Sequence, residues 1–253
     1  MIGVIGGTGA ESLLDMYPTT DSKVIKTEYG TSPTINILEV ENKEVAYIPR
    51  HNKGHSTPPH MINYRANIEA LHQIGVSDIL ATNSVGSLDM NIQPGSLLIP
   101  DNFIDFTHNR VSTFYDESVV HIDCTYPYCQ TLRENLINDN DVHPYGIYIA
   151  TEGPRFETGA EIQFYKSIGG SVVGMTGVPE VVLAREKQMC YASICAVTNY
   201  AASISPNKLT ITEVIDAMKM CEENLIELLT STIKKTDKNE DCSCKKLLND
   251  AII

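Results

Sequence analysis

Two short stretches of this sequence carry residue types that could recognise a small ligand. The stretch Thr198-Asn199-Tyr200-Ala201 ends a buried strand predicted over residues 191–198, and Arg50-His51 directly follows an apolar run over residues 44–49. In open α/β sheets, ligands bind beyond the carboxyl ends of the strands, so both stretches are candidates for one site. An amide side chain can face a heterocycle and an arginine can face an anion, which together indicate a nucleoside and a phosphate.

Small polar residues also follow other predicted strands. Thr8 comes after the glycines that end the strand over residues 2–5, and its hydroxyl lies beside backbone N–H groups that could bind an anion. This loop lacks the GxGxxG spacing of a dinucleotide site, and by itself it fits a tight turn equally well. Several such ends in one domain indicate a single convergent site. The strand ends that contribute are Thr8, Arg50, Asn83-Ser84, Met175-Thr176 and Thr198-Asn199.

The elements that must position these residues alternate between strands and helices. Further buried strands are predicted over residues 77–81, 145–150 and 172–173, and the alternating segments 34–40 and 44–48 predict a hairpin. Helices are predicted over 63–71, 131–138, 159–167 and 181–189, and a long last helix follows a capping box from Thr210 to Glu213. Residues 101–129 are expected to form a loop, and a loop of that length usually serves a function or an interface. This order predicts an α/β fold with one doubly wound domain.

Composition excludes several classes of partner. The chain has 253 residues, 42% of them hydrophobic, which is enough for one large α/β domain. A formal net charge of −13 argues against a nucleic acid or an anionic membrane as partner. No apolar run approaches the length of a membrane helix, and the first residues do not resemble a secretory signal, so we expect a cytoplasmic protein.

The cysteines and histidines predict no metal site. Seven cysteines form no zinc-like spacing in the sequence, and several lie in apolar patterns that favour reduced, buried thiols. The exception is Cys242-Ser-Cys244 in the polar tail, for which a solvated pair is favoured over redox-linked or metal-linked chemistry. The loop over residues 50–60 holds three histidines without the helical spacing of metal ligands.

Taken together, the motifs resemble those of the trimeric purine nucleoside phosphorylase and methylthioadenosine phosphorylase family. The resemblance runs in order from residue 1 to about residue 234. It implies one domain over residues 1–234 with a central mixed, partly barrel-like sheet, followed by a polar tail over residues 235–253. It also implies a homotrimer or a dimer of trimers. The matching motifs are Gly6-Gly7-Thr8-Gly9, Arg50-His51, residues 63–67, 82–88, 152–156 and 175–184, and Thr198-Asn199-Tyr200.

The resemblance also implies roles for individual residues. The phosphate site would comprise Thr8, Arg50, His51, Asn83, Ser84 through its backbone N–H, and Thr176. The nucleoside would lie on Met175 under the ribose and on Phe156 against the base, with Asn199, Tyr200 and Ala201 at the purine edge. His51 would add a hydrogen bond or a charge to catalysis, and Asn199 would stabilise the departing purine. His121 resembles a position that reaches the sugar pocket of a neighbouring subunit.

Departures from the methylthioadenosine enzymes predict the substrate. Those enzymes have aspartates on both sides of the position of Tyr200, whereas this chain has Asn199 and Ala201. An amide N–H can donate to a 6-oxo group, and Glu157 matches a carboxylate that accepts from the N1–H of hypoxanthine or guanine. A mismatched buried donor or acceptor costs about 1–3 kcal/mol, so both residues favour a 6-oxopurine. Ile211 matches a position that is apolar in enzymes that bind a 5′-methylthio group, which predicts S-methyl-5′-thioinosine.

Several alternatives stay open at this level. The substrate could instead be methylthioadenosine, inosine or guanosine, and related nucleosidases use water in place of phosphate. A non-catalytic nucleoside-binding protein is a rival of a different class, although none of the phosphate positions looks damaged. The expected reaction passes through an oxocarbenium-like sugar. It uses inorganic phosphate as co-substrate and no metal or organic cofactor.

Overall fold

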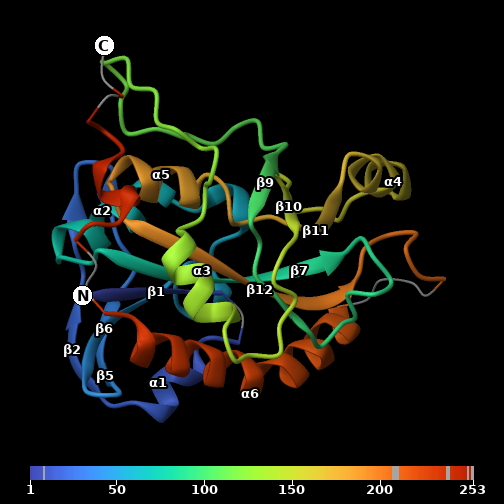
Figure 1. The fold of residues 1–253 in the computed structure, drawn as a ribbon, viewed down its shortest axis with the longest axis horizontal. Helices are drawn as coiled ribbons and strands as arrows, with labels where there is room; N and C mark the ends of the chain where they lie inside the picture. Colours follow the sequence, from blue (N-terminus) through green and yellow to red (C-terminus); the bar gives the residue numbers. More distant parts are fainter. Residues whose placement is uncertain (8, 207–210, 238–239, 250, 252–253) are drawn as a thin grey trace.

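A mixed β-sheet with helices on both faces forms the frame of the molecule (Figure 1). The computed structural model describes residues 1–7, 9–206, 211–237, 240–249 and 251, and of residues 55, 211 and 213–215 it describes the backbone only. Within these ranges the main sheet has ten strands, in the order β2-β5-β6-β1-β7-β11-β10-β9, with β12 paired to β7 and β8. Strands β1, β6, β7 and β12 are parallel neighbours, while β11 runs antiparallel to β7.

The strands and helices have the following bounds. The main-sheet strands are β1 (Ile2–Gly6), β2 (Thr19–Lys23), β5 (Ile35–Val40), β6 (Lys43–Pro49), β7 (Asp78–Ser87), β8 (Leu97–Leu98), β9 (Asn102–Asp105), β10 (Ile147–Ala150), β11 (Gly170–Gly174) and β12 (Cys190–Tyr200), and β3 (Lys26–Thr27) pairs with β4 (Gly30–Thr31). The α-helices are α1 (Ser12–Met16), α2 (Tyr64–Gln73), α3 (Gln130–Ile137), α4 (Gly159–Ser167), α5 (Glu180–Glu186) and α6 (Ile211–Lys235). Short 3-10 turns are η1 (Lys53–His55), η2 (Pro59–Met61) and η3 (Ser243–Lys246).

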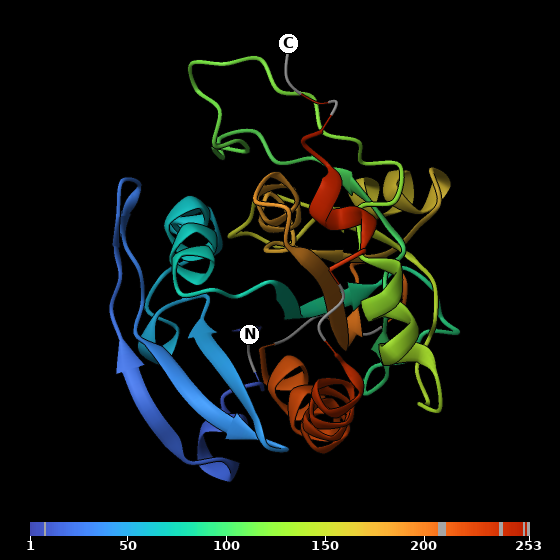
Figure 2. The same cartoon turned by 60° about the vertical axis from the view of Figure 1, so that its left-hand side comes forward.

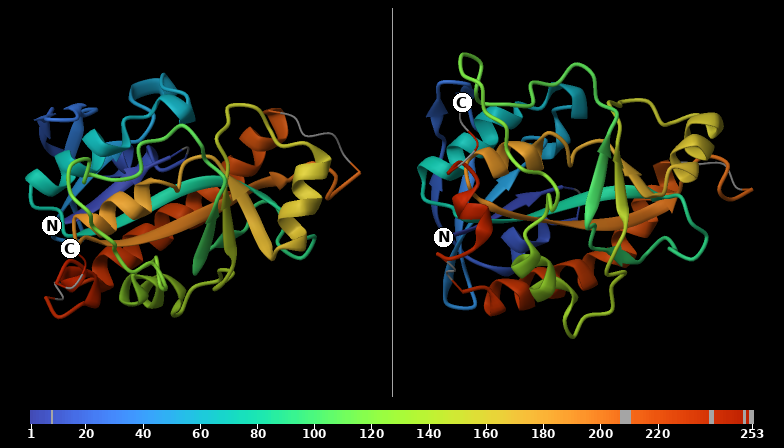
Figure 3. Two further views of the ribbon diagram at one scale, coloured as in Figure 1. Left: turned by 90° about the horizontal axis from the view of Figure 1, so that it is seen from above. Right: turned by 45° about the horizontal axis from the view of Figure 1, so that its top comes forward.

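Alternating side chains of the central strands build a separate apolar core on each face of the sheet. On β12, Tyr191 and Val197 point into the core that holds α2 and α5, whereas Ala192 and Ile194 point into the core that holds α1, α3 and α6. This alternation is the period of two expected of a strand that is buried on both faces. Figures 2 and 3 show the two helical layers on either side of the long strands β7 and β12. The predicted α/β fold with a central mixed sheet flanked by helices is confirmed.

Strand β7 changes its neighbour halfway along, and this change creates an opening in the sheet. Its first residues, 78–81, pair with β1, while Gly86 and Ser87 pair with β11. Residues 82–85 therefore have neither neighbour on that side, although β12 continues to pair with them on the other. Ligands bind where neighbouring strands part in this way, because loops from both sides reach the gap.

Many predicted elements are confirmed. The predicted hairpin is β5 and β6, and its turn residues Glu41 and Asn42 have positive φ angles of 50° and 61°, as a tight two-residue hairpin turn requires. Helix α2 begins after Asn63, whose side chain accepts the N–H of Ala66. Among the described residues, no helix is both long and apolar enough to cross a membrane.

Other boundaries were predicted wrongly. Residues 82–87 belong to β7 and residues 199–200 to β12, so these polar segments lie within strands and do not follow them. The expected loop over residues 101–129 contains β9, which pairs with β10. The polar residues in these segments have a low propensity for strands, so the sequence did not predict that the strands continue through them. Pairing with neighbouring strands in a wide sheet overrides that local propensity. The capping-box residue Thr210 lies outside the described residues, as does the side chain of Glu213.

Candidate active site

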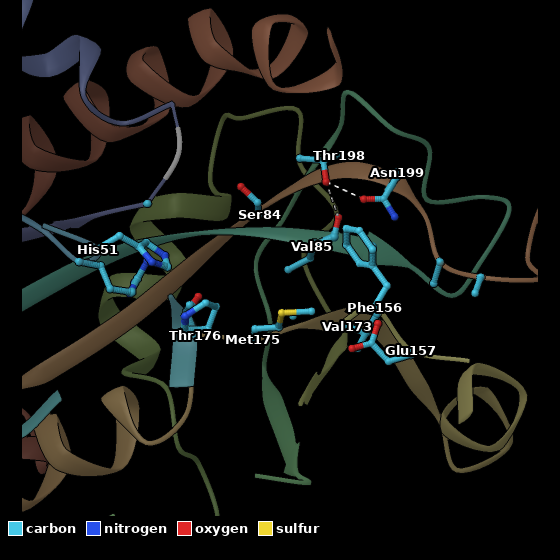
Figure 4. Close-up of a pocket in the computed structure, with 17 residues that line it drawn as sticks. His51, Ser84, Val85, Phe156, Glu157, Val173, Met175, Thr176, Thr198 and Asn199 are labelled. Carbon is cyan, nitrogen blue, oxygen red and sulfur yellow. Dashed lines mark hydrogen bonds between the residues drawn. The ribbon is translucent and has the colours of Figure 1, made fainter. Parts of the chain in front are cut away.

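A pocket with a cavity volume of about 180 Å³, partly open to solvent, lies at the opening beside β7. Figure 4 shows His51 and Thr176 at one end, Met175 in the middle, and Phe156, Glu157 and Asn199 at the other end. A pocket with distinct groups at its two ends suits a small molecule that has an elongated shape. The pocket is lined by Gly7, Arg50, His51, Pro59, Ser84, Val85, Gly86, Phe156, Glu157, Val173, Gly174, Met175, Thr176, Thr198, Asn199, Ala201 and Ala202.

Arg50 is held at the base of this pocket by a buried carboxylate. Its Nε and Nη2 atoms donate to Glu180 at 2.7 and 2.6 Å, and both side chains have an exposed fraction of 0%. Its Nη1 donates to the carbonyl oxygen of Thr82 at 2.6 Å, in the unpaired part of β7. Burial opposes the charge of Arg50, but Glu180 outweighs that effect, so the pKa of Arg50 is raised above its ordinary value.

The ion pair changes what Arg50 can offer a ligand. Because the charge of Glu180 compensates that of the guanidinium, the pair presents N–H donors with little net charge. Tyr191 donates to Glu180 at 2.8 Å, which satisfies a further lone pair of the carboxylate. Burial and the neighbouring Glu180 raise the pKa of Tyr191 well above its ordinary value, so the phenol stays a neutral donor. An anion in the pocket would therefore meet a rigid, pre-oriented donor.

Other donors surround the same end of the pocket. His51 Nδ1 lies 2.8 Å from the carbonyl oxygen of Thr57, and since a carbonyl can only accept, Nδ1 carries a proton there. The Thr176 hydroxyl donates to Asn83 Oδ1 at 2.7 Å, and the Asn83 amide donates to Ser193 at 2.8 Å. Asn83 thus lies behind the pocket wall, where it orients Thr176. The Ser84 hydroxyl points to the sulfur of Met218 on α6, at 3.3 Å.

Asn199 occupies the opposite end, where a β-bulge redirects strand β12. Val197 pairs with Val85 and Asn199 with Gly86, so Thr198 is an extra residue in β12. The Asn199 amide nitrogen donates to the Tyr200 carbonyl at 3.0 Å, and its Oδ1 accepts from the Thr198 hydroxyl at 2.8 Å. The carbonyl of Tyr200 can only accept, which fixes the NH₂ group on that side. One N–H and one lone pair of this amide are left for a ligand.

Phe156 and Glu157 reach the pocket from the loop between β10 and α4. Glu157 Oε1 accepts the Thr151 hydroxyl at 2.6 Å, which holds the half-buried carboxylate beside the Phe156 ring. The loop is anchored at its end by a capping box, in which Thr158 and Glu161 exchange hydrogen bonds at the start of α4. Gly153 in this loop has φ of +67° and lies against Met175, so a side chain would be strained there and would collide with the Met175 sulfur.

Most of the predicted site residues meet in this pocket, and a few do not. Arg50, His51, Ser84, Phe156, Glu157, Met175, Thr176, Asn199 and Ala201 line it. Tyr200 turns away, with its hydroxyl donating to the Met90 carbonyl at 3.2 Å. His121 is exposed and its backbone N–H donates to the Ala251 carbonyl at 2.8 Å, apart from the pocket. Thr8 and the side chain of Ile211 lie outside the described residues.

Sequence reasoning missed Glu180, Tyr148 and the bulge at Thr198. The Tyr148 hydroxyl accepts the backbone N–H groups of Thr176 and Gly177 at 3.2 and 3.1 Å, and so fixes the turn after β11. An isolated acidic residue at the start of a helix is the only local signal of Glu180. An acidic residue at this position normally indicates a favourable interaction with the helix dipole. It does not predict that Glu180 pairs with Arg50, which lies 130 residues away in the sequence.

The prediction of reduced, buried thiols is confirmed for Cys190, Cys195 and Cys221, but the prediction for Cys242 and Cys244 was wrong. Cys242 and Cys244 are buried, with exposed fractions of 8% and 5%, and are not a solvated pair. Their sulfur atoms meet those of Cys129 and Cys190, and all four lie within 4.8 Å of one another. Among the described residues this is the one group that could hold a metal ion, and none of its members lines the pocket. Sequence spacing could not reveal it, because the members come from three distant parts of the chain.

Comparison with known proteins gives a family match over most of the chain. The family model described as "Phosphorylase superfamily" matches residues 1–234. A protein of Methanothermobacter thermautotrophicus named "Probable S-methyl-5'-thioinosine phosphorylase" is 50% identical over 251 residues, covering 99% of this chain and 90% of the relative. A protein of Dictyoglomus turgidum named "Probable 6-oxopurine nucleoside phosphorylase" is 48% identical over 257 residues, covering 98% of this chain and 97% of the relative.

The fold is also similar to a solved structure. Methylthioadenosine phosphorylase from Schistosoma mansoni in complex with adenine has a TM-score of 0.92 and 30% sequence identity. The superposition covers 99% of this chain and 98% of that protein. The similarity in sequence and in structure therefore extends over the whole domain that forms the pocket.

Proposed function

Because this chain belongs to the phosphorylase superfamily, we propose that it is a nucleoside phosphorylase that cleaves 6-oxopurine nucleosides with inorganic phosphate. Its preferred substrate in this proposal is S-methyl-5′-thioinosine, and the products are hypoxanthine and 5-methylthioribose 1-phosphate. The observation that carries the proposal is the order of groups along the pocket. Donors around Arg50 and His51 lie at one end, Met175 in the middle, and Asn199 with Glu157 at the other end.

The amide end of the pocket fits a 6-oxopurine. The remaining N–H of Asn199 can donate to O6, and its remaining lone pair can accept from a protonated N7. Glu157 keeps Oε2 for the N1–H of the base, since Oε1 is taken by Thr151. At the position of Ala201, which is 5% exposed, there is no carboxylate to accept from a 6-amino group. In a 6-aminopurine, the amino group would be a donor that faces the N–H donor of Asn199, and this mismatch costs about 1–3 kcal/mol.

The opposite end fits phosphate. Phosphate would accept from the Nε2–H of a protonated His51 and from the N–H groups of Arg50 that face neither Glu180 nor Thr82, below the ribose that packs on Met175. The Thr176 hydroxyl would turn from Asn83 to donate to the phosphate. Bond cleavage sends the electron pair of the C1′–N9 bond to the purine, while a phosphate oxygen attacks the cationic C1′. Asn199 stabilises the charge that grows on the N7/O6 edge, so its hydrogen bonds strengthen in the transition state. Preorganised donors of this kind need no rearrangement during the reaction.

The group at the 5′ position is the finer part of the proposal. The apolar Ile211 favours a methylthio group over a hydroxyl, and relatives of similar identity carry both the methylthioinosine and the 6-oxopurine nucleoside names. Inosine and guanosine are therefore the nearest alternatives, followed by methylthioadenosine. No metal or organic cofactor takes part in the proposed reaction.

A phosphate-dependent assay tests both parts. Release of free base from methylthioinosine, methylthioadenosine, inosine and guanosine is measured with and without phosphate. We expect kcat/KM to be highest for methylthioinosine and no turnover without phosphate. Equal turnover in the absence of phosphate would establish hydrolysis, and no turnover of any nucleoside would establish a binding protein. A preference for methylthioadenosine would refute the proposed role of Asn199 and Ala201.

We also propose that the active enzyme is a homotrimer or a dimer of trimers. The exposure of His121 outside the pocket of its own chain supports a role in the sugar pocket of a neighbouring subunit. Light scattering coupled to gel filtration measures the assembly, and His121→Ala should raise the KM for the nucleoside without changing the molar mass. The cytoplasmic location stays a prediction that cell fractionation can test.

A further inference from the structure

Four buried cysteines meet at the end of β12 that is remote from the pocket. Cys190 is the first residue of β12 and Asn199 is close to its end, so about 30 Å of extended strand separates the two sites. Cys129 directly precedes α3, and Cys242 and Cys244 flank Ser243 at the start of η3. Figure 1 shows the C-terminal segment, in red, lying beside α5 at the left of the molecule, away from α4.

The spacing of the sulfur atoms fits one tetrahedral metal ion. Zinc binds thiolates at about 2.3 Å, and a tetrahedron of that radius has edges of about 3.8 Å between sulfurs. The Cys129 and Cys242 sulfurs lie 3.7 Å apart, and all four sulfurs lie within 4.8 Å of one another. A disulfide would instead need a separation of about 2.05 Å. All four cysteines are free thiols in the structure.

Half of the cluster is built on rigid parts of the fold. The backbone N–H of Cys190 donates to the Ser77 carbonyl at 2.9 Å, and the N–H of Cys129 donates to the Tyr191 carbonyl at 2.8 Å. These bonds fix two ligands on the sheet before any ion binds. The other two ligands come from the C-terminal segment, where the N–H of Lys245 donates to the Cys242 carbonyl at 3.0 Å. An ion would therefore join the C-terminal segment to the sheet.

The surroundings favour thiolates, which are the form that binds metal. The four side chains are 1–8% exposed, which excludes water from the ligands. The sulfur of Cys129 lies at the N-terminus of α3, an eight-residue helix whose dipole stabilises negative charge at that end. Lys245 directly follows Cys244 and adds positive charge that offsets part of the net charge of a zinc tetrathiolate, whereas Lys246 is paired with Asp241 at 3.2 Å.

We propose that Cys129, Cys190, Cys242 and Cys244 bind one Zn²⁺ ion as a structural site that fixes the C-terminal segment to the sheet. Four thiolates in a closed tetrahedron leave no open position for substrate, so the ion stabilises the fold and does no chemistry. The fixed segment also supports the loop that carries His121, through the hydrogen bond from the His121 N–H to the Ala251 carbonyl. This inference is independent of the proposed function.

Metal analysis of the full-length protein is the first test. Protein purified under reducing conditions with Zn²⁺ in the medium should retain one zinc ion per chain after gel filtration, measured by mass spectrometry of the metals. X-ray absorption at the zinc edge should show four sulfur neighbours at about 2.3 Å. Cobalt in place of zinc should give the intense visible absorption of a tetrahedral tetrathiolate. Protein without bound metal, or with iron in place of zinc, overturns the proposal.

Thiol counting separates zinc from disulfide bonds. In denaturant with a chelator and no reductant, all seven cysteines should react with a thiol reagent. A count of three would mean that the four clustered cysteines form two disulfides, which also overturns the proposal. Cys242→Ser should lose the bound zinc, whereas Cys124→Ser and Cys221→Ser, which lie outside the cluster, should keep it. Retention of zinc by Cys242→Ser contradicts the assigned ligands.

Stability gives a readout that does not depend on activity. A strong chelator should lower the Tm of the wild type and of Cys124→Ser, because metal binding contributes to folding. The same chelator should not change the Tm of Cys242→Ser further. If that variant does not fold, the cobalt spectrum of the wild-type protein still decides the question. An unchanged wild-type Tm together with loss of zinc would refute the structural role.

Discussion

Replacing Glu180 by glutamine tests whether the Arg50 guanidinium faces the phosphate. Glutamine keeps the size of the side chain but removes the charge, and its NH₂ group would face one of the guanidinium donors. The native contact has two charge-assisted hydrogen bonds at 2.6 and 2.7 Å between side chains of 0% exposure. Arg50 in Glu180→Gln is therefore a buried cation without a counter-ion.

The loss of stability follows from that burial. Removing one partner of a buried ion pair costs about 3–5 kcal/mol. For a chain of this size, each kcal/mol corresponds to roughly 2–4 °C in Tm. We therefore expect the Tm of Glu180→Gln, without phosphate, to fall by roughly 6–20 °C.

Phosphate should return part of that stability. Any ligand present at a concentration of a hundred times its Kd stabilises the folded wild type by about 2.7 kcal/mol. In Glu180→Gln the phosphate dianion also replaces the missing counter-charge. The rise in Tm from buffer to saturating phosphate should therefore be larger in the variant than in the wild type.

The assay is thermal unfolding across a phosphate titration, with sodium chloride adjusted to keep the ionic strength constant. Glu69→Gln is the matched control, because Glu69 on α2 pairs at 2.6 Å with Lys187, which directly follows α5, and neither residue lines the pocket. It should lower the Tm without changing the increment that phosphate gives. A phosphate increment in Glu180→Gln that is no larger than in the wild type would refute a guanidinium that faces the anion.

Three further variants test the base end of the pocket and the loop beside it. Asn199→Ala should lower kcat more than it raises KM, since its hydrogen bonds strengthen in the transition state; a pure KM effect in steady-state kinetics would remove Asn199 from catalysis. Asn199→Asp combined with Ala201→Asp should shift kcat/KM toward the 6-amino nucleoside, and an unchanged ratio in a folded double variant would mean that the base lies elsewhere. The hydrogen bonds from Arg155 and from the Thr158 backbone lower the pKa of Glu161 from 4.5 to about 2. A lowered folded-state pKa contributes stability above pH 4.5 that is lost as the pH falls toward 2, so unfolding should become easier over that range in the wild type and less so in Glu161→Gln. Parallel pH profiles of the two proteins in chemical denaturation would contradict this.

The sequence by itself determined the chemistry of the site. Local patterns identified the hairpin, the helix capped by Asn63 and the α/β order, because each depends on residues a few positions apart. Polar residues at the ends of apolar runs identified Arg50, His51, Thr176 and Asn199, and all of them line one pocket. These signals are local, since each depends on a polar residue that directly follows an apolar run in the sequence.

Only the tertiary structure decided which distant groups became partners. Arg50 lies 130 residues from Glu180, and Cys129 lies 113 residues from Cys242, yet the packing of the sheet brings each pair together. The opening beside residues 82–85 exists because β7 exchanges β1 for β11, and the bulge at Thr198 then sets the register of Asn199. The residue pattern of a single segment cannot predict such contacts, because they depend on how separate elements pack against one another. The residues that neighbour a side chain across a sheet come from other parts of the chain.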